Sequence, residues 1–147
     1  MRRTDDPYDL ERFVTAQAPT YAATLDELRS GKKRTHWMWF VFPQLRGLGR
    51  SETAIFYGIS GFPEASAYLE HPVLSFRLSE CTKLVLTSRS ASLANLFGTP
   101  DDLKFRSSMT LFAVASLKPF RIFHQALDEL AEGPDSRTLD MLKASPS

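Results

Sequence analysis

The chain has 147 residues, of which 43% are hydrophobic and 24% are charged, and its net charge is +1. This length and composition suit one globular domain with a core of its own, and they exclude a fibrous, collagenous or wholly disordered protein. The nearly neutral charge gives no overall reason to expect nucleic acid or an anionic membrane as a partner, so such a partner would need a local basic cluster.

Cysteine usage and hydropathy indicate where the protein resides. The single cysteine, Cys81, cannot form an internal disulfide, which suits a reducing compartment, and its apolar surroundings indicate a core position. No run of 18 apolar residues occurs, and no hydrophobic segment follows Arg2-Arg3. We therefore expect a cytoplasmic protein with no membrane segment and no membrane partner.

The first third of the chain predicts two helices and one short segment of undecided type. Asp6 as N-cap predicts a helix over 6–17, and a second helix over 19–30 ends where Gly31 suits a left-handed cap. The six apolar residues 37–42 are too few for periodicity to type, although their β-branched and aromatic content slightly favours a strand. Prolines and glycines predict a loop over 43–50.

The remaining chain is helical in pattern. Its capping residues, prolines and apolar spacing predict helices over 51–59, 63–70, 72–87, 92–97, 99–117 and 119–132, with one further turn around Leu139 and Leu142. The predicted fold class is all-α: a compact, multihelical single domain, residues 1–147, of about seven helices, which could include one short extended segment near 37–42. We expect an ordered core over about 6–142 and flexible ends, 1–5 and 143–147.

The histidines argue against a metal site. His36, His71 and His124 show neither the four-residue helical spacing nor the nearby carboxylates of a hydrolytic metal centre, and no pair of cysteines occurs. His71 directly precedes Pro72 and indicates a helix boundary, while His124 lies beside an apolar stripe as a boundary residue. We predict no metal and no cofactor.

The loop before Ser51 invites comparison with phosphate-binding motifs, since glycines before a helix expose backbone N–H groups to an anion. It lacks the third glycine of the dinucleotide fingerprint and the Gly-Lys-Ser of a P-loop. Two glycines, Arg46 and Arg50 could still bind one phosphate or carboxylate. The favoured alternative is a tight loop with solvated arginines.

A basic and aromatic stretch is the largest charge asymmetry in the chain. Residues 29–51 contain no acid and six cations, namely Arg29, Lys32, Lys33, Arg34, Arg46 and Arg50. Trp37 and Trp39 could stack a nucleobase beside phosphate-binding cations. In the structural alternative, which we favour slightly, the rings lie in the core and the cations are solvated.

A third polar group follows residue 101. Lys104, Arg106, Ser107, Ser108 and Thr110 lie in or beside an otherwise apolar helix. Because buried polar groups need partners, these side chains could bind a ligand. The default interpretation is that the hydroxyls bond the backbone one turn earlier.

Five stretches together resemble one bacterial family, the domain of unknown function numbered 1810, often mislabelled calpastatin. They are Asp6-Pro7-Tyr8-Asp9-Leu10 with Arg12-Phe13, His36 through Gln44, Gly47-Leu48-Gly49, His71-Pro72, and Arg106 through Phe112. The resemblance extends from Asp6 to about Leu142 and implies a compact, mainly helical domain without an assigned activity. A distant similarity to the NADAR proteins would imply a link to ADP-ribose and NAD metabolism.

The leading functional hypothesis is therefore an enzyme or binder that acts on a nucleotide or ADP-ribose derivative. The substrate-binding candidates are Trp37, Trp39, Gln44, Arg46, Arg50, Ser51, Lys104, Arg106, Ser107 and Ser108. In a glycosidase-type hydrolase, Glu52 would act as the base and His36 as the proton carrier.

Two other classes of protein remain open. One is a non-catalytic module that uses the basic patch over 29–50 to bind nucleic acid or protein. The other is a helical scaffold without a small ligand. A nucleotide site requires 36–51 and 104–110 to meet in one concave pocket, whereas a binding module requires 32–34 to be exposed on a flat or convex surface.

Overall fold

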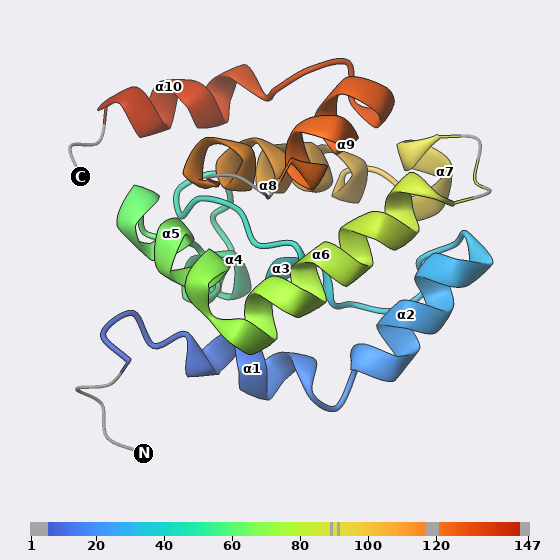
Figure 1. The fold of residues 1–147 in the computed structure, drawn as a ribbon, viewed down its shortest axis with the longest axis horizontal. Coiled ribbons are helices and arrows are strands. Elements are labelled where there is room, and N and C mark those ends of the chain that lie inside the picture. The colour runs from blue at the N-terminus through green and yellow to red at the C-terminus, as the bar shows by residue number, and fades with distance from the viewer. Residues whose placement is uncertain (1–5, 89, 91, 117–120, 145–147) are drawn as a thin grey trace.

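The computed structural model describes residues 6–88, 90, 92–116 and 121–144, and this part of the chain is all-α (Figure 1). Ten helices lie within it: α1 (Glu11–Gln17), α2 (Tyr21–Ser30), α3 (Met38–Val41), α4 (Glu52–Phe56), α5 (Phe62–Glu70), α6 (Pro72–Leu86), α7 (Leu93–Phe97), α8 (Asp101–Ala115), α9 (Ile122–Leu130) and α10 (Ser136–Ala144). The described residues form no strand, only an isolated parallel bridge between Leu45 and Ile59. The predicted fold class is confirmed.

Helix α8 is the centre of the packing. Nine of its 15 residues are buried, and it contacts α3, α5, α7, α9 and α10. In Figure 1, α9 and α10 lie above α8, α1 and α2 lie below it, and α6 crosses in front. The ring of Phe105 meets Phe42 edge-on at 5.0 Å between centroids, and Phe112 contacts Tyr68 and Phe123. Large aromatic side chains therefore fill the core around this helix.

Several helix ends follow the capping signals in the sequence. Gly31 adopts a φ of 83° after α2, in the left-handed region that favours glycine. The Oγ of Ser51 accepts a hydrogen bond from the Ala54 N–H at 3.1 Å at the start of α4. His71 caps α6, because its Nδ1 accepts from the N–H groups of Val73 and Leu74 at 3.2 and 3.3 Å. The predicted helix boundary at His71 is thus confirmed.

Of the two alternatives left open for residues 37–42, a strand or a buried helical turn, the structure has the helical turn, because Met38–Val41 form α3. The slight preference for a strand is therefore wrong. Met38 and Val41, three positions apart, are both buried. The N–H groups of Val41 and Phe42 donate to the carbonyls of Trp37 and Met38 at 3.0 and 3.1 Å. Among the described residues no strand lies beside this segment, so an extended backbone would leave its polar groups unpaired, whereas a helical turn pairs them internally.

Other helix boundaries also differ from the prediction. Helix α1 begins at Glu11 because Asp9 adopts a φ of 53°, which interrupts a helix, although the Asp6 carboxylate still caps it by accepting from the Leu10 and Glu11 N–H groups. Helix α4 ends at Phe56 because the chain then turns into the bridge at Ile59.

The C-terminal part of the described chain is more helical than predicted. Residues 136–144 form the complete helix α10 instead of one turn. The Asp135 carboxylate starts it by accepting from the Thr138 N–H and hydroxyl at 2.9 and 2.7 Å. The described residues hold ten helices rather than the seven or so predicted, because α3 and α10 add to the eight helical ranges predicted one by one from the sequence. The predicted helix start at Pro119, the predicted flexible end 1–5 and residues 145–147 of the predicted flexible end 143–147 lie outside the described residues, whereas residues 143 and 144 belong to α10.

Candidate functional site

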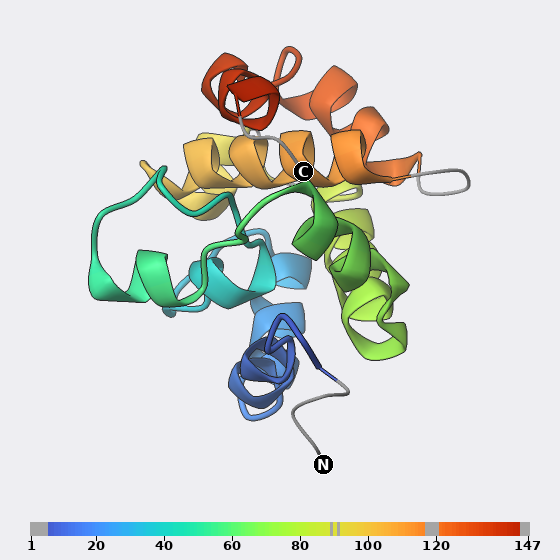
Figure 2. The same cartoon turned by 90° about the vertical axis from the view of Figure 1, so that its left-hand side faces the viewer.

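The chain between Gln44 and Ser60, which we call the α4 lobe, leaves the core and returns to the same point. Its ends are joined by backbone hydrogen bonds from the Ile59 N–H to the Gln44 carbonyl at 2.9 Å and from the Arg46 N–H to the Ile59 carbonyl at 2.8 Å. Leu45 and Ile59 are buried beneath it. Figure 2 shows the lobe projecting from one side of the molecule. It is a surface loop on a rigid base, the arrangement in which binding residues are most common.

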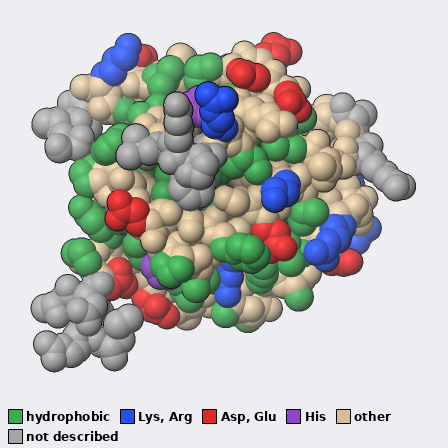
Figure 3. Space-filling view, in the orientation of Figure 1, with side chains coloured by type: hydrophobic (Ala, Val, Ile, Leu, Met, Phe, Trp, Pro, Cys, Tyr) green, Lys and Arg blue, Asp and Glu red, His purple; other side chains and the backbone are tan. Residues whose placement is uncertain are grey.

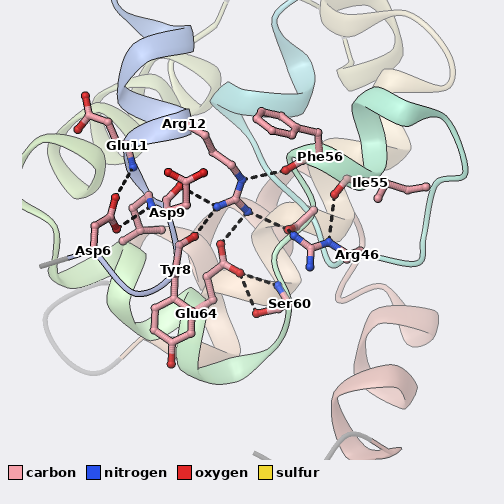
Figure 4. Close-up of polar contacts among 12 residues, drawn as sticks. Asp6, Tyr8, Asp9, Glu11, Arg12, Arg46, Ile55, Phe56, Ser60 and Glu64 are labelled. Atoms are coloured by element: carbon pink, nitrogen blue, oxygen red, sulfur yellow. Dashed lines mark hydrogen bonds and ion pairs between the residues drawn. The ribbon is translucent and has the colours of Figure 1, made fainter. Parts of the chain in front are cut away.

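A buried arginine from α1 fixes the returning half of the lobe (Figure 4). The guanidinium of Arg12 uses all five of its N–H groups: Nε donates to Phe56 O at 2.8 Å, Nη1 to Tyr8 O at 2.6 Å and Asp9 O at 2.9 Å, and Nη2 to Gly58 O at 3.0 Å and Glu64 Oε2 at 2.8 Å. The side chains of this ion pair are only 6% and 3% exposed. Because every donor is satisfied, Arg12 stabilises structure and has no donor left for a ligand.

Glu64 completes this anchor from α5. Its Oε2 binds Arg12, and its Oε1 accepts from the N–H and the hydroxyl of Ser60, both at 2.8 Å. A carboxylate this deeply buried needs an opposite charge and several donors, and it has both. The Arg12–Glu64 pair therefore joins α1, α5 and the end of the α4 lobe.

A second arginine, Arg46, belongs to the outgoing half of the lobe and bonds the returning half. Arg46 donates from Nε to the Ile55 carbonyl at 3.0 Å and from Nη2 to the Gly58 carbonyl at 2.8 Å. The last carbonyls of a helix have no partner within it and carry partial negative charge, so guanidinium groups are suitable caps. A Cβ on Gly58 would lie 2.6 Å from the Arg46 Cβ, so glycine permits this close approach. Two arginines thus hold the backbone at 55, 56 and 58.

The side chains on this fixed backbone are apolar and exposed. Ile55 is 50% exposed and Phe56 is 54% exposed. Phe56 contacts Tyr57 edge-on at 4.8 Å between centroids, and Tyr57 in turn contacts Phe40 at 5.3 Å and the buried Phe13 at 5.8 Å. A continuous row of rings therefore connects the core to the exposed tip, which we define as Ile55 and Phe56.

A buried carboxylate, Glu27, holds the first part of the basic and aromatic stretch. It was not among the site residues predicted from the sequence. Glu27 accepts four hydrogen bonds: from Arg34 N at 2.7 Å, Thr35 N at 3.1 Å, Thr35 Oγ1 at 2.6 Å and Trp37 Nε1 at 2.9 Å. Burial by itself would raise the pKa of this carboxyl, but the hydrogen bonds outweigh burial and lower the pKa to about 2. Glu27 therefore stays ionised and fixes the backbone ahead of α3.

The structure brings two of the predicted ligand-binding segments together at one contact. Trp39 is partly buried, and the Lys104 ammonium lies 4.7 Å from the centroid of its ring. Lys104 also pairs with Asp101 at 3.4 Å, and Lys33 pairs with the same carboxylate at 3.0 Å. Trp37, in contrast, is buried with its indole N–H bonded to Glu27. Trp39 is thus the tryptophan that a ligand could reach.

The polar residues of α8 lie mostly against the protein itself. Arg106 donates to the carbonyls of Gly133 and Pro134 at 2.9 and 3.0 Å, and Ser107 donates to the Leu103 carbonyl at 3.2 Å. The buried hydroxyl of Ser108 has no hydrogen-bond partner among the described residues. Ser107 agrees with the default interpretation, because its hydroxyl bonds the backbone one turn earlier, whereas Arg106 bonds carbonyls of the chain between α9 and α10.

Of the remaining predicted site residues, Gln44, Arg50, Ser51 and Glu52 belong to the α4 lobe, whereas His36 lies between α2 and α3. His36, Arg50, Glu52 and Ser51 are exposed, and Gln44 is partly buried. The Ser51 hydroxyl caps α4, which confirms it as a helix start. No hydrogen bond joins His36 to Glu52 in the part of the chain that the structure describes. The structure therefore does not assemble a catalytic pair from these two residues.

On the face drawn in Figure 3, hydrophobic and charged side chains are interspersed. Two cavities formed by the described residues lie elsewhere than the predicted site, and of the polar α8 residues only Thr110 lines one of them. One of about 350 Å³ follows α6 from Phe76 to Thr87, and one of about 200 Å³ lies between α8, α9 and α10. Residues 6–88, 90, 92–116 and 121–144 contain no group of three or more His, Cys, Asp or Glu side chains placed to hold a metal ion. No helix within these residues has both the length and the hydropathy that crossing a bilayer requires.

These features define an all-α protein in which buried ion pairs and carboxylates hold an exposed apolar tip. Residues 7–142 match the family described as "Protein of unknown function (DUF1810)", and the chain belongs to that family. The crystal structure of the conserved hypothetical protein Rv1873 from Mycobacterium tuberculosis is 53% identical, with a TM-score of 0.92 over 95% of this chain and 100% of that chain.

The family resemblance inferred from the sequence is thereby confirmed. Neither match supports the predicted distant similarity to NADAR proteins. No curated protein matches the chain.

Three residues that position the site, Arg12, Glu27 and Glu64, were not predicted as site residues. Glu27 and Glu64 leave a weak signal in the sequence, because each is an acid beside apolar residues of a helix. Glu27 lies three residues after Thr24 and one before Leu28, so it occupies the face of α2 that is buried. Glu64 precedes the buried Ala65 at the start of α5. A charged residue on the apolar face of a helix indicates a buried polar partner, although the sequence does not say which one.

Proposed function

We propose that this protein is a non-catalytic interaction module that binds another protein through the α4 lobe. The observation that carries the proposal is the tip, where Ile55 and Phe56 are about half exposed on a backbone held by Arg12 and Arg46. Adjacent exposed apolar side chains on a rigid element are typical of a docking surface rather than of an ordinary solvated loop.

The energetics favour protein binding at this tip. Fully burying an exposed phenylalanine or isoleucine side chain contributes about 1.5–3 kcal/mol, so covering the exposed half of Ile55 or Phe56 contributes roughly half of that. Four hydrogen bonds from two arginines to lobe carbonyls already fix the backbone, so binding loses little conformational entropy. A few such side chains provide most of the affinity in protein interfaces. We therefore expect Phe56 to dominate binding.

The test places a photo-crosslinking amino acid at position 56 and, as a matched control, at Phe76, which is 64% exposed on α6. A partner captured only from position 56 is then purified, and its affinity is measured by calorimetry. Phe56→Ser is expected to weaken binding at least about tenfold, and Phe76→Ser less than about twofold. Equal capture from both positions, or an unchanged affinity for Phe56→Ser, would contradict the proposal.

A nucleotide or ADP-ribose ligand is the second candidate, favoured by the contact of Lys104 with the ring of Trp39. An aromatic ring beside an ammonium group can stack a base and bind a phosphate. In this case about 1 mM ADP-ribose or NAD raises the melting temperature of the wild type but not of Trp39→Ala. If the ligand is also cleaved, Glu52→Gln abolishes the cleavage. If neither ligand raises the melting temperature, only the docking proposal remains.

A further inference from the structure

A second surface of the chain is hollowed and is lined by charge opposite to that of the α4 lobe. A hollow of about 250 Å³ lies where α1 meets α5 and the start of α6. Apolar side chains line it, and three carboxylates surround it: Pro7, Leu10 and Ala67 provide the apolar surface, and Asp6, Glu11 and Glu70 provide the charge. We call this surface the acidic hollow.

The acidic hollow and the lobe tip have a fixed relative position. Figure 4 shows Asp6 and Glu11 on one side of the Arg12–Glu64 pair and Phe56 and Arg46 on the other. The same guanidinium bonds the Tyr8 carbonyl, next to the hollow, and the Phe56 carbonyl, at the tip. The molecule therefore presents the two surfaces together as one rigid unit.

We propose that the lobe tip of one molecule docks in the acidic hollow of a second copy of this chain, with the contact repeated across a two-fold axis. This inference rests on the proposed docking function and names its partner. In such a dimer the lobe tip of each molecule contacts the acidic hollow of the other, so the same contact is made twice.

Charge complementarity argues for this partner. Arg50 is exposed on the same lobe as the tip, and Nη1 of Arg46 has no hydrogen-bond partner among the described residues. With Glu52 as the one acid between residues 44 and 60, two arginines leave the lobe with a net charge of +1. Glu11 and Glu70 are exposed at the hollow. Opposite charges around an apolar contact fix its register and speed association, whereas like charges in that place oppose it.

The experiment measures the oligomeric state by sedimentation equilibrium, with Arg50→Glu and Glu70→Lys as the charge variants. We expect the wild type to dimerise and each variant alone to dimerise at least about tenfold more weakly. An equimolar mixture of the two variants is expected to recover the wild-type affinity. In that mixed dimer one contact pairs the two substituted side chains with opposite charges, and the other pairs the native Arg50 and Glu70.

The controls and outcomes separate this inference from the proposed function. Phe56→Ser is expected to abolish dimerisation, whereas Phe76→Ser on α6, an exposed residue that lines a different cavity from the hollow, leaves it unchanged. A wild type that remains monomeric at about 500 µM, or mixed variants that do not recover, would overturn the inference. If Phe56-dependent binding to a different protein were then found, the docking function would stand without the dimer.

Discussion

Glu27→Gln tests how the basic and aromatic stretch is held, because this carboxylate accepts four hydrogen bonds from residues 34, 35 and 37. Glutamine has nearly the same shape, but it lacks the charge and places an NH₂ donor opposite groups that are themselves donors. A carboxyl pKa lowered from 4.5 to about 2 corresponds to roughly 3 kcal/mol of folding free energy. We expect the variant to lose about that much stability at about pH 7.

The pH dependence has a defined sign. The folded pKa of Glu27 lies below its unfolded value, so the stabilisation is complete above about pH 4.5 and is lost as the pH falls towards 2. The difference in unfolding free energy between the wild type and Glu27→Gln is therefore expected to shrink steadily over this range. Above about pH 5 it is expected to be constant.

Urea unfolding followed by tryptophan fluorescence measures this difference. Trp39→Phe in both proteins leaves Trp37, whose indole N–H donates to Glu27, as the only tryptophan. Asp26→Asn is the matched control: an exposed acid one residue earlier on α2, where we expect a change within about 0.5 kcal/mol. A loss below about 1 kcal/mol for Glu27→Gln at pH 7, or one that stays constant down to pH 3, would refute this account of Glu27.

Three further sets of substitutions test other parts of the structure by urea unfolding. His71→Ala removes the cap of α6 and is expected to lose about 1 kcal/mol, whereas His71→Asp keeps an acceptor there and loses less. Arg12→Met leaves Glu64 buried and unpaired, at a loss of about 3–5 kcal/mol, and the double variant Arg12→Met/Glu64→Leu should lose less than the sum of the two single changes. Ser108→Ala should be neutral or stabilising, because its hydroxyl has no partner among the described residues, whereas Thr110→Val breaks two hydrogen bonds and should lose about 1–2 kcal/mol. Equal losses at these two α8 positions would contradict the last prediction.

Much of the helical architecture could be predicted because its signals are local. Apolar spacing, together with Pro72 at the start and His71 as the cap, defines α6 within about one residue. Ser92 and Gly98 likewise bracket α7. These signals act within one turn of the helix that they begin or end, so the sequence is sufficient to read them.

The conformation of α3 could not be predicted, because it depends on groups distant in sequence. Six apolar residues suit a strand or a buried helical turn equally well. The indole of Trp37 is held ten residues away by Glu27, and the side-chain amide of Gln17 donates to the Phe40 carbonyl at 2.6 Å. Tertiary contacts of this kind override a weak preference for strand.

The candidate site was located only in part, since sequence shows charge but not the partner of that charge. Arg46 was predicted to hold phosphate, yet two of its nitrogens donate to the carbonyls of Ile55 and Gly58. Arg12 occurred within the family motif, but its partner Glu64 lies 52 residues later. Pairings across such separations follow from the fold, so they could not be read before the fold was known.

The buried charges and the exposed apolar tip form one arrangement. Glu27 fixes residues 34–37, where the basic stretch enters α3, and the Arg12–Glu64 pair fixes residues 56–60, where the chain returns from the lobe. Removing charges from water opposes folding unless each is paired and hydrogen-bonded, and here each buried charge also immobilises the backbone that it bonds. Core packing alone does not require Ile55 and Phe56 to be exposed on so firmly held a segment. A binding surface does require it, because rigidity lowers the entropic cost of docking. The first substitutions aimed at function should therefore be made at Ile55 and Phe56, rather than at Trp37 or Arg46, where loss of structure would obscure the result.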